Sequence, residues 1–324
     1  MTLTKRTFIG LAGAATLAMT TSMPALAQDW EPTKPIDFVI MAGPGGGADQ
    51  IARFLQSVSE KKDMTSRPLV PNNKGGGSGA EALIALQGTN DPDHSILVTL
   101  NSFFTTPLRQ DNLGIDIKTF TPIAMMAVDP FVLWVHKDSG ITSFDQWVEE
   151  VKAADGEYVM GGTGKGQEDS IVIAYLSGAY DLKIKYIPYD GGGAVAKDLA
   201  GKQIMATVNN PAEAKGFYEA GDFVPLLSFS DERSDNFPDV PTLKEQGHDF
   251  SYNNQRAVVG APGMSDEAAA YYQNLFKDIY ESEEWQGYME SESLAPLWMG
   301  PDETRAFWET QIERHQELLA AMGE

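Results

Sequence analysis

Four glycine-rich turns constrain the fold of this chain more than any other feature. They cover residues 43–47, 75–79, 161–166 and 191–193, and each follows a short apolar run and precedes a segment of helical periodicity. After the first turn, Ile51, Leu55 and Val58 share one face of a helix. Strand, glycine turn and helix repeated in this order predict an α/β protein, with mainly parallel sheets flanked by helices.

The rest of the chain continues this alternation. Strands are predicted at 36–41, 69–70, 96–100, 131–136, 158–160, 184–189, 206–208, 223–229 and 257–260. Helix starts are predicted where a capping residue or proline precedes an apolar periodic segment, at Ser143, Asn210–Pro211, Ser265 and Pro301. No internal repeat or linker tract divides the chain into domains.

The N-terminal segment has the pattern of a secretory signal peptide. Lys5 and Arg6 precede an apolar run, 8–19, that is too short to span a bilayer, and the small residues Ala25-Leu26-Ala27 form a cleavage site. We therefore expect residues 1–27 to be removed and the mature protein to begin at Gln28 in the periplasm. The run 4–9 also resembles a twin-arginine signal with lysine in the first basic position, so export by Sec and by Tat both remain open.

Composition argues against several classes of function. The chain has 46 acidic and 24 basic residues, a formal net charge of −22 and no cysteine. A chain this acidic repels phosphate, which argues against nucleic acid as a partner. Without cysteine it forms no disulfide, thiolate metal site or cysteine nucleophile. The 4 histidines lie far apart without metal-ligand spacing, and there is no Gly-x-Ser-x-Gly elbow, so we predict neither an enzyme nor a cofactor or metal site.

Two nucleotide-binding patterns match only in part. Gly43-x-Gly45-x-x-Ala48 fits the dinucleotide fingerprint, but no acidic residue ends the next predicted strand to hold a ribose. Gly164-Lys165 fails as a phosphate-binding loop because Gly166 stands where serine or threonine is required.

The glycine turns themselves point to an anionic small molecule. Such turns let the backbone approach a ligand closely and present the free N–H groups of a helix start, which attract anions. Ligands of open α/β sheets bind at the carboxyl ends of strands, where these turns lie. One such turn is more often only a tight turn, but four favour a binding site lined by turns from different domains.

Four further residues are candidates for contact with an anion. Lys165 lies inside a glycine turn and Arg256 just precedes a strand, and for each cation a surface position is an equal alternative. Ser102 and Thr163 would offer hydroxyl groups from strand ends.

Several segments, in order along nearly the whole mature chain, resemble the Bug-type (TctC-like) solute-binding proteins of tripartite tricarboxylate transporters. The similar segments are 35–53, 73–79, 161–164 with 167–169, 186–193, 208–213, 239–247 and 256–262. Each segment alone is a weak signal, whereas the ordered set is specific.

The resemblance implies a two-lobed periplasmic binding protein of the Venus-flytrap kind (type II-like), with two hinge crossings. Lobe 1 would comprise 28–128 plus 253–324, and lobe 2 would comprise 129–252. In this family one ligand carboxylate lies between the first glycine loop and the loop after the Tyr-x-Gly-Gly strand. Carried over by position, the ligand-binding residues are Gly45, Gly46, Gly47, Asp49, Tyr189, Gly191, Gly192 and Gly193.

The chain departs from the family pattern at two places. Asp190 replaces the commoner lysine or arginine, and would oppose an anion if its side chain approached the site. The pair Asn209–Asn210 replaces a common acidic position and should suit a more anionic ligand. Gly164, beside Thr163 and Lys165, completes the candidate site.

The resemblance thus implies a monomeric receptor that captures a small organic carboxylate, a di- or tricarboxylate, and delivers it to a two-subunit inner-membrane permease. A periplasmic α/β hydrolase and a binding protein that feeds a signalling partner are the alternatives. A receptor returns its ligand unchanged, and a permease gene pair nearby would favour transport over signalling. The sequence does not identify the acid.

Overall fold

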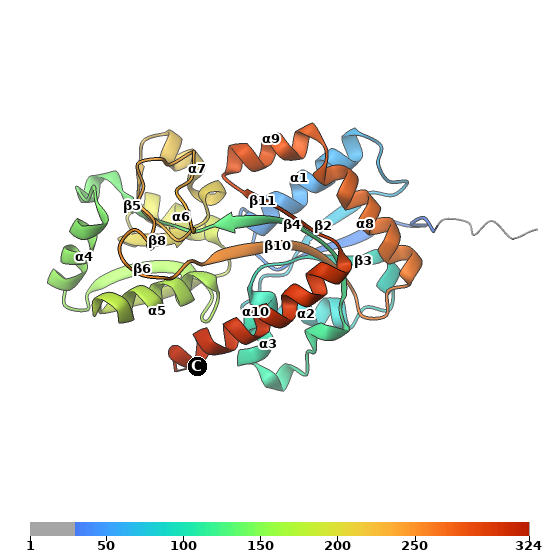
Figure 1. Cartoon of the computed structure of the whole chain (residues 1–324), viewed down its shortest axis with the longest axis horizontal. Helices are drawn as coiled ribbons and strands as arrows, with labels where there is room; N and C mark the ends of the chain where they lie inside the picture. Colours follow the sequence, from blue (N-terminus) through green and yellow to red (C-terminus); the bar gives the residue numbers. More distant parts are fainter. Residues whose placement is uncertain (1–29, 324) are drawn as a thin grey trace, which may run out of the picture.

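The chain folds around two β-sheets that lie side by side along the long axis of the molecule (Figure 1). The structure, a computed structural model, describes residues 30–323, so the predicted signal peptide lies outside the described residues. We call the six-stranded sheet with its helices the first lobe and the five-stranded sheet with its helices the second lobe. This is the two-lobed α/β architecture that the sequence predicts.

The strand order of each sheet mixes distant parts of the chain. The first sheet runs β11 (Ala295–Met299), β4 (Thr121–Pro130), β10 (Asn253–Gly260), β3 (Ser95–Val98), β1 (Ile36–Ile40) and β2 (Leu69–Asn73). The second sheet runs β7 (Ile184–Tyr189), β6 (Tyr158–Thr163), β8 (Ala206–Asn209), β5 (Val132–His136) and β9 (Phe223–Ser228).

Helices cover the faces of both sheets. The first lobe carries α1 (Gly47–Lys61), α2 (Ala80–Gln87), α3 (Ser102–Arg109), α8 (Asp266–Tyr280), α9 (Glu283–Glu292) and α10 (Pro301–Ala321). The second lobe carries α4 (Phe144–Ala153), α5 (Glu168–Tyr180), α6 (Gly192–Ala200) and α7 (Pro211–Glu219). Short 3-10 turns lie at Pro92–His94, Asp111–Leu113, Ile117–Thr119 and Lys137–Ser139.

The expectation of mainly parallel sheets is wrong, because both sheets are mixed. In the first sheet β1 pairs in parallel with β2 and β3, but β10 and β11 pair antiparallel with their neighbours. In the second sheet β6 pairs in parallel with β7 and β8, whereas β5 pairs antiparallel with β8 and β9. The antiparallel pairings involve β4, β5, β9 and β10, which are the strands next to the two crossings between the lobes, and β11 at the edge of the first sheet.

Amphipathic helices and buried strands form the cores as their periodicity predicts. In α1, Ile51, Leu55 and Val58 point into the core of the first lobe. The second sheet has a hydrophobic cluster on each face, one around Trp147 and one around Trp134. Burial of these apolar faces is the main favourable term in folding.

Capping side chains hold several helix starts. The Ser143 hydroxyl accepts a hydrogen bond from the Gln146 N–H at 3.3 Å, and the Ser265 hydroxyl accepts one from the Ala268 N–H at 3.2 Å. Asn210 lies at the N-cap position of α7 ahead of Pro211, as predicted, and its N–H donates to Glu213 Oε2 at 3.3 Å. These bonds satisfy backbone donors that the first turn of a helix leaves unpaired.

The chain crosses between the sheets twice. It leaves the first sheet after Pro130 and enters the second at Val132, and it returns between Ser228 and Asn253. The domain division at 128/129 and 252/253 stays a prediction. Helix α10 forms a further connection: Trp308 packs in the first-lobe core, while Leu319 belongs to a second-lobe cluster. Figure 1 shows this helix extending from the first lobe toward the second.

The sequence analysis did not predict two of the strands, β4 and β11. In β4 a nearly continuous apolar run lacks the alternation of a half-buried strand, and it continues directly into the apolar β5. In β11 a proline and irregular pairing weaken the pattern. β4 is followed by a strand instead of a glycine turn and a helix, so it lacks the order that revealed other strands. β11 is followed by Gly300 and α10, but its own strand pattern is weak.

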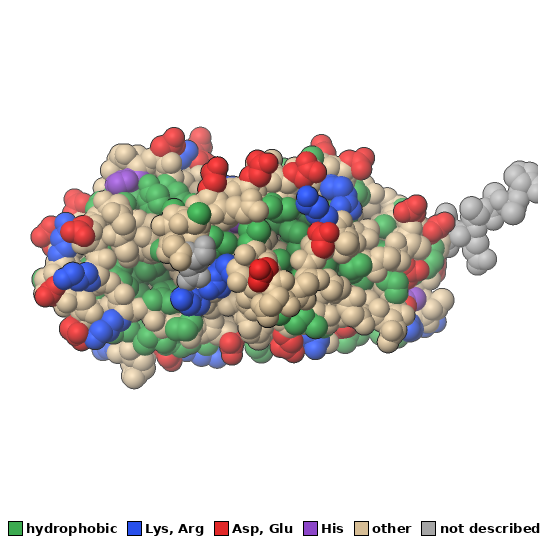
Figure 2. Space-filling view, turned by 90° about the horizontal axis from the view of Figure 1, so that it is seen from below, with side chains coloured by type: hydrophobic (Ala, Val, Ile, Leu, Met, Phe, Trp, Pro, Cys, Tyr) green, Lys and Arg blue, Asp and Glu red, His purple; other side chains and the backbone are tan. Residues whose placement is uncertain are grey.

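On the face shown in Figure 2, charged side chains of both signs are interspersed. Among residues 30–323, no helix is both long enough and apolar enough to cross a membrane.

Candidate functional site

The glycine turns of the two lobes contact each other. The Gly43 N–H donates to the Asp190 carbonyl at 3.0 Å, which joins the turn after β1 to the turn after β7. A Cβ added at Gly193 would lie 2.7 Å from the Gly45 carbonyl oxygen. Gly45 itself has a φ of +79°, a left-handed conformation that favours glycine. The backbones of these turns therefore approach closely because neither carries a side chain there.

The other two glycine turns also face one another across the lobes. A Cβ added at Gly164 would lie 2.3 Å from the Ser78 hydroxyl oxygen. The Lys165 carbonyl accepts hydrogen bonds from the Arg109 guanidinium and from Ser78. All four turns that the sequence analysis singled out thus lie at one interface between the lobes.

Carboxylates of the second lobe cap helix starts of the first lobe. The Gly47 N–H, at the start of α1, donates to Oε1 of Glu213 from α7 at 2.8 Å. The Ser102 N–H, at the start of α3, donates to Oε1 of Glu168 from α5. The partial positive charge of a helix start stabilises such carboxylates. In both contacts the first lobe therefore supplies the N–H donor and the second lobe supplies the carboxyl acceptor.

Two acidic residues cap turns of their own lobe in the same way. Asp49 Oδ2 accepts from the Gly45 N–H at 2.8 Å, and Asp169 Oδ2 accepts from the Thr163 N–H at 2.7 Å. Asp49 also contacts Arg53 and Asn73. Asp49 therefore stabilises the first glycine turn through contacts within the first lobe.

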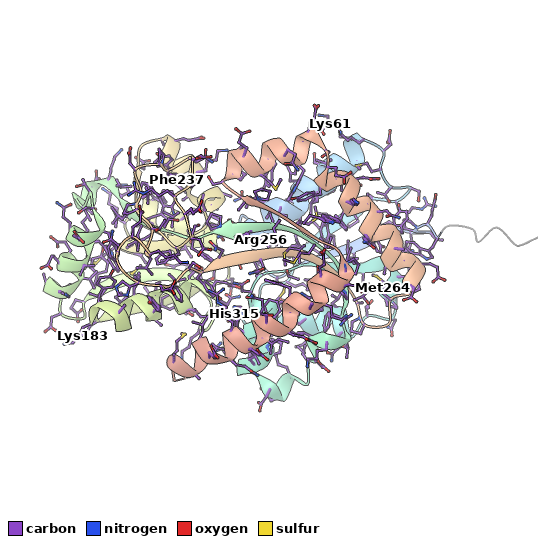
Figure 3. The ribbon with its side chains drawn as sticks, viewed as in Figure 1. Lys61, Lys183, Phe237, Arg256, Met264 and His315 are labelled. Carbon is purple, nitrogen blue, oxygen red and sulfur yellow. The ribbon has the colours of Figure 1, made fainter. Side chains whose placement is uncertain are left out.

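Arg256 lies at the centre of the molecule, on β10 between the lobes (Figure 3). Its side chain is 1% exposed. Nε donates to Asp129 Oδ2 at 2.9 Å, and Nη2 donates to the same oxygen and to Asn210 Oδ1 at 3.0 Å. Nη1 has no hydrogen-bond partner among residues 30–323. A buried guanidinium N–H without an acceptor is costly unless a ligand or water supplies one.

These groups surround a small cavity between the lobes. Its volume is about 20 Å³, and a site for one water molecule needs roughly 10–15 Å³. The cavity is lined by Met41, Ala42, Gly47, Leu100, Thr163, Gln167, Glu168, Asp169, Asp190, Gly191, Gly192, Asn210, Glu213, Asn254 and Arg256. An organic acid enters this space only if the lobes separate.

Burial shifts the ionisation of the acidic lining. It raises the pKa of Glu168, and it raises that of Asp169 well above the usual value, with the nearby Glu213 carboxylate adding to the effect. Burial also raises the pKa of Glu213 to about 7, although the Gly47 N–H and Arg256 oppose the shift. The cause is the same in each case, because a low-dielectric environment disfavours the charged carboxylate.

The structure brings most of the predicted site residues to this cavity or its wall. Those in the lining are Gly47, Thr163, Gly191, Gly192, Asn210 and Arg256. Those in the adjoining contacts are Gly45, Gly46, Gly193, Asp49, Asn209 and the backbone of Ser102. Asn209, for example, donates to the Gly192 carbonyl at 3.1 Å.

Three predicted residues lie away from the cavity lining. Lys165 is exposed on the rim, and Gly164 packs against Ser78. The Tyr189 hydroxyl turns to Asp198 Oδ2 at 2.6 Å. Asp190, which departs from the family pattern, borders the cavity but is exposed.

Sequence analysis missed the acidic character of the cavity. Glu168, Asp169 and Glu213 occur in segments that carry the family resemblance, but none was proposed as a site residue. Their position in the first turn of α5 or α7 was the available signal. In sequence, however, an acid in a first helical turn is explained by the helix dipole alone.

Comparison with known proteins identifies similar chains across almost the whole length. The family described as "Tripartite tricarboxylate transporter family receptor" matches residues 51–323. A UPF0065 protein from the gbd 5' region of Cupriavidus necator is 25% identical, with 98% of both chains covered. Protein BugT of Bordetella pertussis is 24% identical, with 92% of both chains covered.

Solved structures show the same fold. The periplasmic binding protein BugD superposes with a TM-score of 0.85 at 22% identity, over 90% of this chain and 98% of BugD. An R. palustris protein solved with adipate gives a TM-score of 0.84 at 22% identity, over 90% and 98% of the two chains. MatC of Rhodopseudomonas palustris, solved with bound malate, gives 0.81 at 16% identity, over 89% and 99%.

Proposed function

Because the chain belongs to the tripartite tricarboxylate transporter family receptors, we propose that it captures a small organic carboxylate between its lobes and delivers it to a two-subunit inner-membrane permease. The family and its solved relatives are binding proteins, and this chain is therefore a binding protein and not an enzyme. The relatives solved with adipate and with malate support a carboxylate as the ligand.

One observation carries the proposal: turns of both lobes and a buried arginine surround the same cavity. Gly47 comes from the first lobe and Gly191–Gly192 from the second, and the unpaired Nη1 belongs to Arg256. Backbone N–H groups at helix starts and a guanidinium are the donors that hold carboxylates in proteins. We assign the ligand carboxylate to these groups.

Capture requires an open state, because the cavity between the lobes is far smaller than any organic acid. The two crossings, at 130–132 and 229–252, are where we place the hinge. A ligand shifts the balance between open and closed states only by its difference in affinity for them. An anion that touches turns of both lobes has such a difference, since the open state offers it one lobe at a time.

Export to the periplasm and a monomeric state belong to the same proposal. The predicted cleavage after Ala27 lies outside the described residues, and intact mass of the secreted protein tests whether the chain begins at Gln28. Light scattering of the mature protein tests the monomer. Co-purification with the two permease subunits, strengthened by ligand, tests delivery.

A thermal-shift screen of the mature protein against mono-, di- and tricarboxylates tests the proposed function directly. A ligand present at one hundred times its dissociation constant should raise the free energy of unfolding by about 2.7 kcal/mol. Small-angle scattering should show contraction with the same compound. A screen in which no carboxylate raises the unfolding temperature would contradict the proposal.

A further inference from the structure

We propose that the ligand of the cavity between the lobes is zwitterionic, with a cationic nitrogen beside its carboxylate, as in an amino acid. This inference rests on the proposed function and narrows its ligand class. The carboxylate would face Arg256 and the start of α1, and the cationic nitrogen would face the acidic residues of the second lobe. A plain di- or tricarboxylate, which the sequence analysis favours, would then be a poor ligand.

The charge of the cavity lining is the first argument. Its described residues include three acids that are buried or half-buried, Glu168, Asp169 and Glu213, the exposed Asp190, and a single basic residue, Arg256. That arginine is already paired with Asp129, which is 0% exposed. The pair is neutral, so the other acids have no cationic side chain in the lining to balance them. In the empty cavity burial and this mutual repulsion favour the protonated acids. A cationic group of a ligand would allow them to ionise.

Two of these acids, Glu168 and Asp169, are buried at the cavity, whereas Glu213 is half-buried and Asp190 is exposed. Glu168 is 2% exposed and Asp169 is 3% exposed. Each accepts one backbone N–H, from Ser102 and Thr163 respectively. An ionised carboxylate has about four acceptor positions, so one N–H leaves capacity for further donors. An ammonium group supplies three donors together with the missing positive charge.

The second argument comes from the other end of the cavity. Nη1 of Arg256 is buried and has no acceptor among the described residues, although the guanidinium lines the cavity. Asp129 and Asn210 occupy the other guanidinium nitrogens. The charged Nη1 group, with two N–H donors, suits one carboxylate, whereas the described lining has no second basic side chain for another. A ligand whose carboxylate contacts Arg256 and whose cationic nitrogen contacts the acids of the second lobe would satisfy both groups.

The Asn209–Asn210 pair does not reverse this conclusion. The sequence argument was that two amides in place of an acid suit a more anionic ligand. In the structure Asn209 donates to the Gly192 carbonyl, and Asn210 donates to the Pro130 carbonyl at 2.7 Å and accepts from Arg256. Both amides are engaged in protein contacts, and Glu213 restores an acid three residues later.

Matched pairs of compounds that differ only in an amino group test the inference. The pairs are succinate with aspartate, glutarate with glutamate, and adipate with 2-aminoadipate, measured by calorimetry on the mature wild-type protein at pH 7.5. In at least one pair we expect the amino compound to bind 10-fold tighter or more. Glu168→Gln should reduce that preference, with Asp169→Asn as a second variant. Glu149→Gln, which removes an exposed acid on α4, should leave it unchanged.

The outcomes separate this inference from the proposed function. If the plain diacid binds as tightly as its amino partner or more tightly, the inference is wrong and the carboxylate receptor stands. Diacid binding accompanied by proton uptake, measured in two buffers of different ionisation heat, would also overturn it, because the acids would then be acting as protonated donors. If neither member of any pair binds and the broader carboxylate screen is also negative, both proposals fail.

Discussion

The two lobes contribute opposite charges to their interface. The first lobe offers the starts of α1 and α3 and the Arg256 guanidinium, although Asp129 of the same lobe neutralises that cation. The second lobe offers the carboxylates of Glu168, Asp169 and Glu213. The difference shows that closure pairs hydrogen-bond donors of the first lobe with acceptors of the second, in addition to the steric fit.

This match has a consequence for ligand binding. Glu213 and Glu168 hold the backbone N–H groups of Gly47 and Ser102, which are the kind of donor an anionic ligand uses. A ligand that closes the lobes around itself must coexist with these carboxylates or displace them. The contrast between a lobe that donates hydrogen bonds and a lobe that accepts them can be tested by substitution and by pH.

The largest effect should come from Asp129→Ala, which leaves the first lobe's central cation without its partner. Arg256 is 1% exposed, so the uncompensated charge stays buried. Breaking a buried ion pair by removing one partner costs about 3–5 kcal/mol. Urea denaturation should show this loss in the free energy of unfolding.

The control for Asp129→Ala is an exposed ion pair of the second lobe. Lys137 Nζ lies 2.6 Å from Asp222 Oδ1, and both side chains are well exposed. Asp222→Ala should cost much less, because exposed ion pairs contribute little to the free energy of unfolding. Equal losses in the two variants would mean that Arg256 does not depend on Asp129.

The next effect tests the contact between the glycine turns. Gly193→Ala places a methyl group 2.7 Å from the Gly45 carbonyl oxygen of the other lobe, and backbone cannot easily give way. We expect the variant to fold but to close poorly, with at least about 10-fold weaker binding of the carboxylate found in the screen, about 1.4 kcal/mol. Calorimetry measures the affinity, and small-angle scattering measures the contraction.

Gly216→Ala is the matched control for the closure variant. It lies in α7 of the same lobe, and an added Cβ there meets no atom within 4 Å. Alanine in a helix interior should stabilise the protein by up to about 1 kcal/mol without changing affinity. Wild-type affinity and contraction in Gly193→Ala would show that the turns do not need to touch.

A smaller effect concerns pH, through Glu213. Burial raises its pKa from 4.5 to about 7, so between these values the folded protein binds more protons than the unfolded chain. Its contribution to stability is therefore complete below pH 4.5 and is lost as the pH rises through 7. Because Glu213 is partly exposed, we expect a loss of about 1–2 kcal/mol over this range, reduced in Glu213→Gln.

His315 changes the free energy of unfolding with pH in the opposite direction to Glu213. Comparing wild type with Glu213→Gln removes this contribution. Burial between the lobes lowers the pKa of this histidine to about 4, so its protonation destabilises the fold as the pH falls below 6.5. Both proteins share that effect, and it cancels in their difference. If the difference in the free energy of unfolding between the two proteins does not change between pH 4.5 and 7, the pKa of Glu213 is not raised by burial.

The smallest effect should come from Lys165→Met. The sequence analysis proposed this lysine as a ligand contact, but its side chain is exposed and lies outside the cavity lining. We expect less than about 2-fold change in affinity, about 0.4 kcal/mol. Lys183→Met, at the far end of the second lobe in Figure 3, is the control. A loss of tens of fold in Lys165→Met alone would return this residue to the site.

Local patterns in the sequence were sufficient to predict much of the fold. The apolar face of α1, the caps at Ser143 and Ser265, and the asparagine–proline start of α7 depend on residues within one helical turn of each other. Such interactions are encoded at short range, so periodicity and capping rules predict them. The four glycine turns were predictable for the same reason, because a backbone that approaches another closely requires them.

Strand pairing and the charge of the cavity were decided only by the tertiary structure. Whether β10 runs parallel or antiparallel to β3 depends on a segment more than 150 residues away, and no local pattern records it. Gly47 and Glu213 are 166 residues apart, and Arg256 and Asp129 are 127 residues apart. Glu213 follows the N-cap of α7 and is locally a capping residue, but folding places its carboxylate on the first helix of the other lobe. Burial then changes its ionisation, and burial is a property of the folded interface and not of the sequence around it.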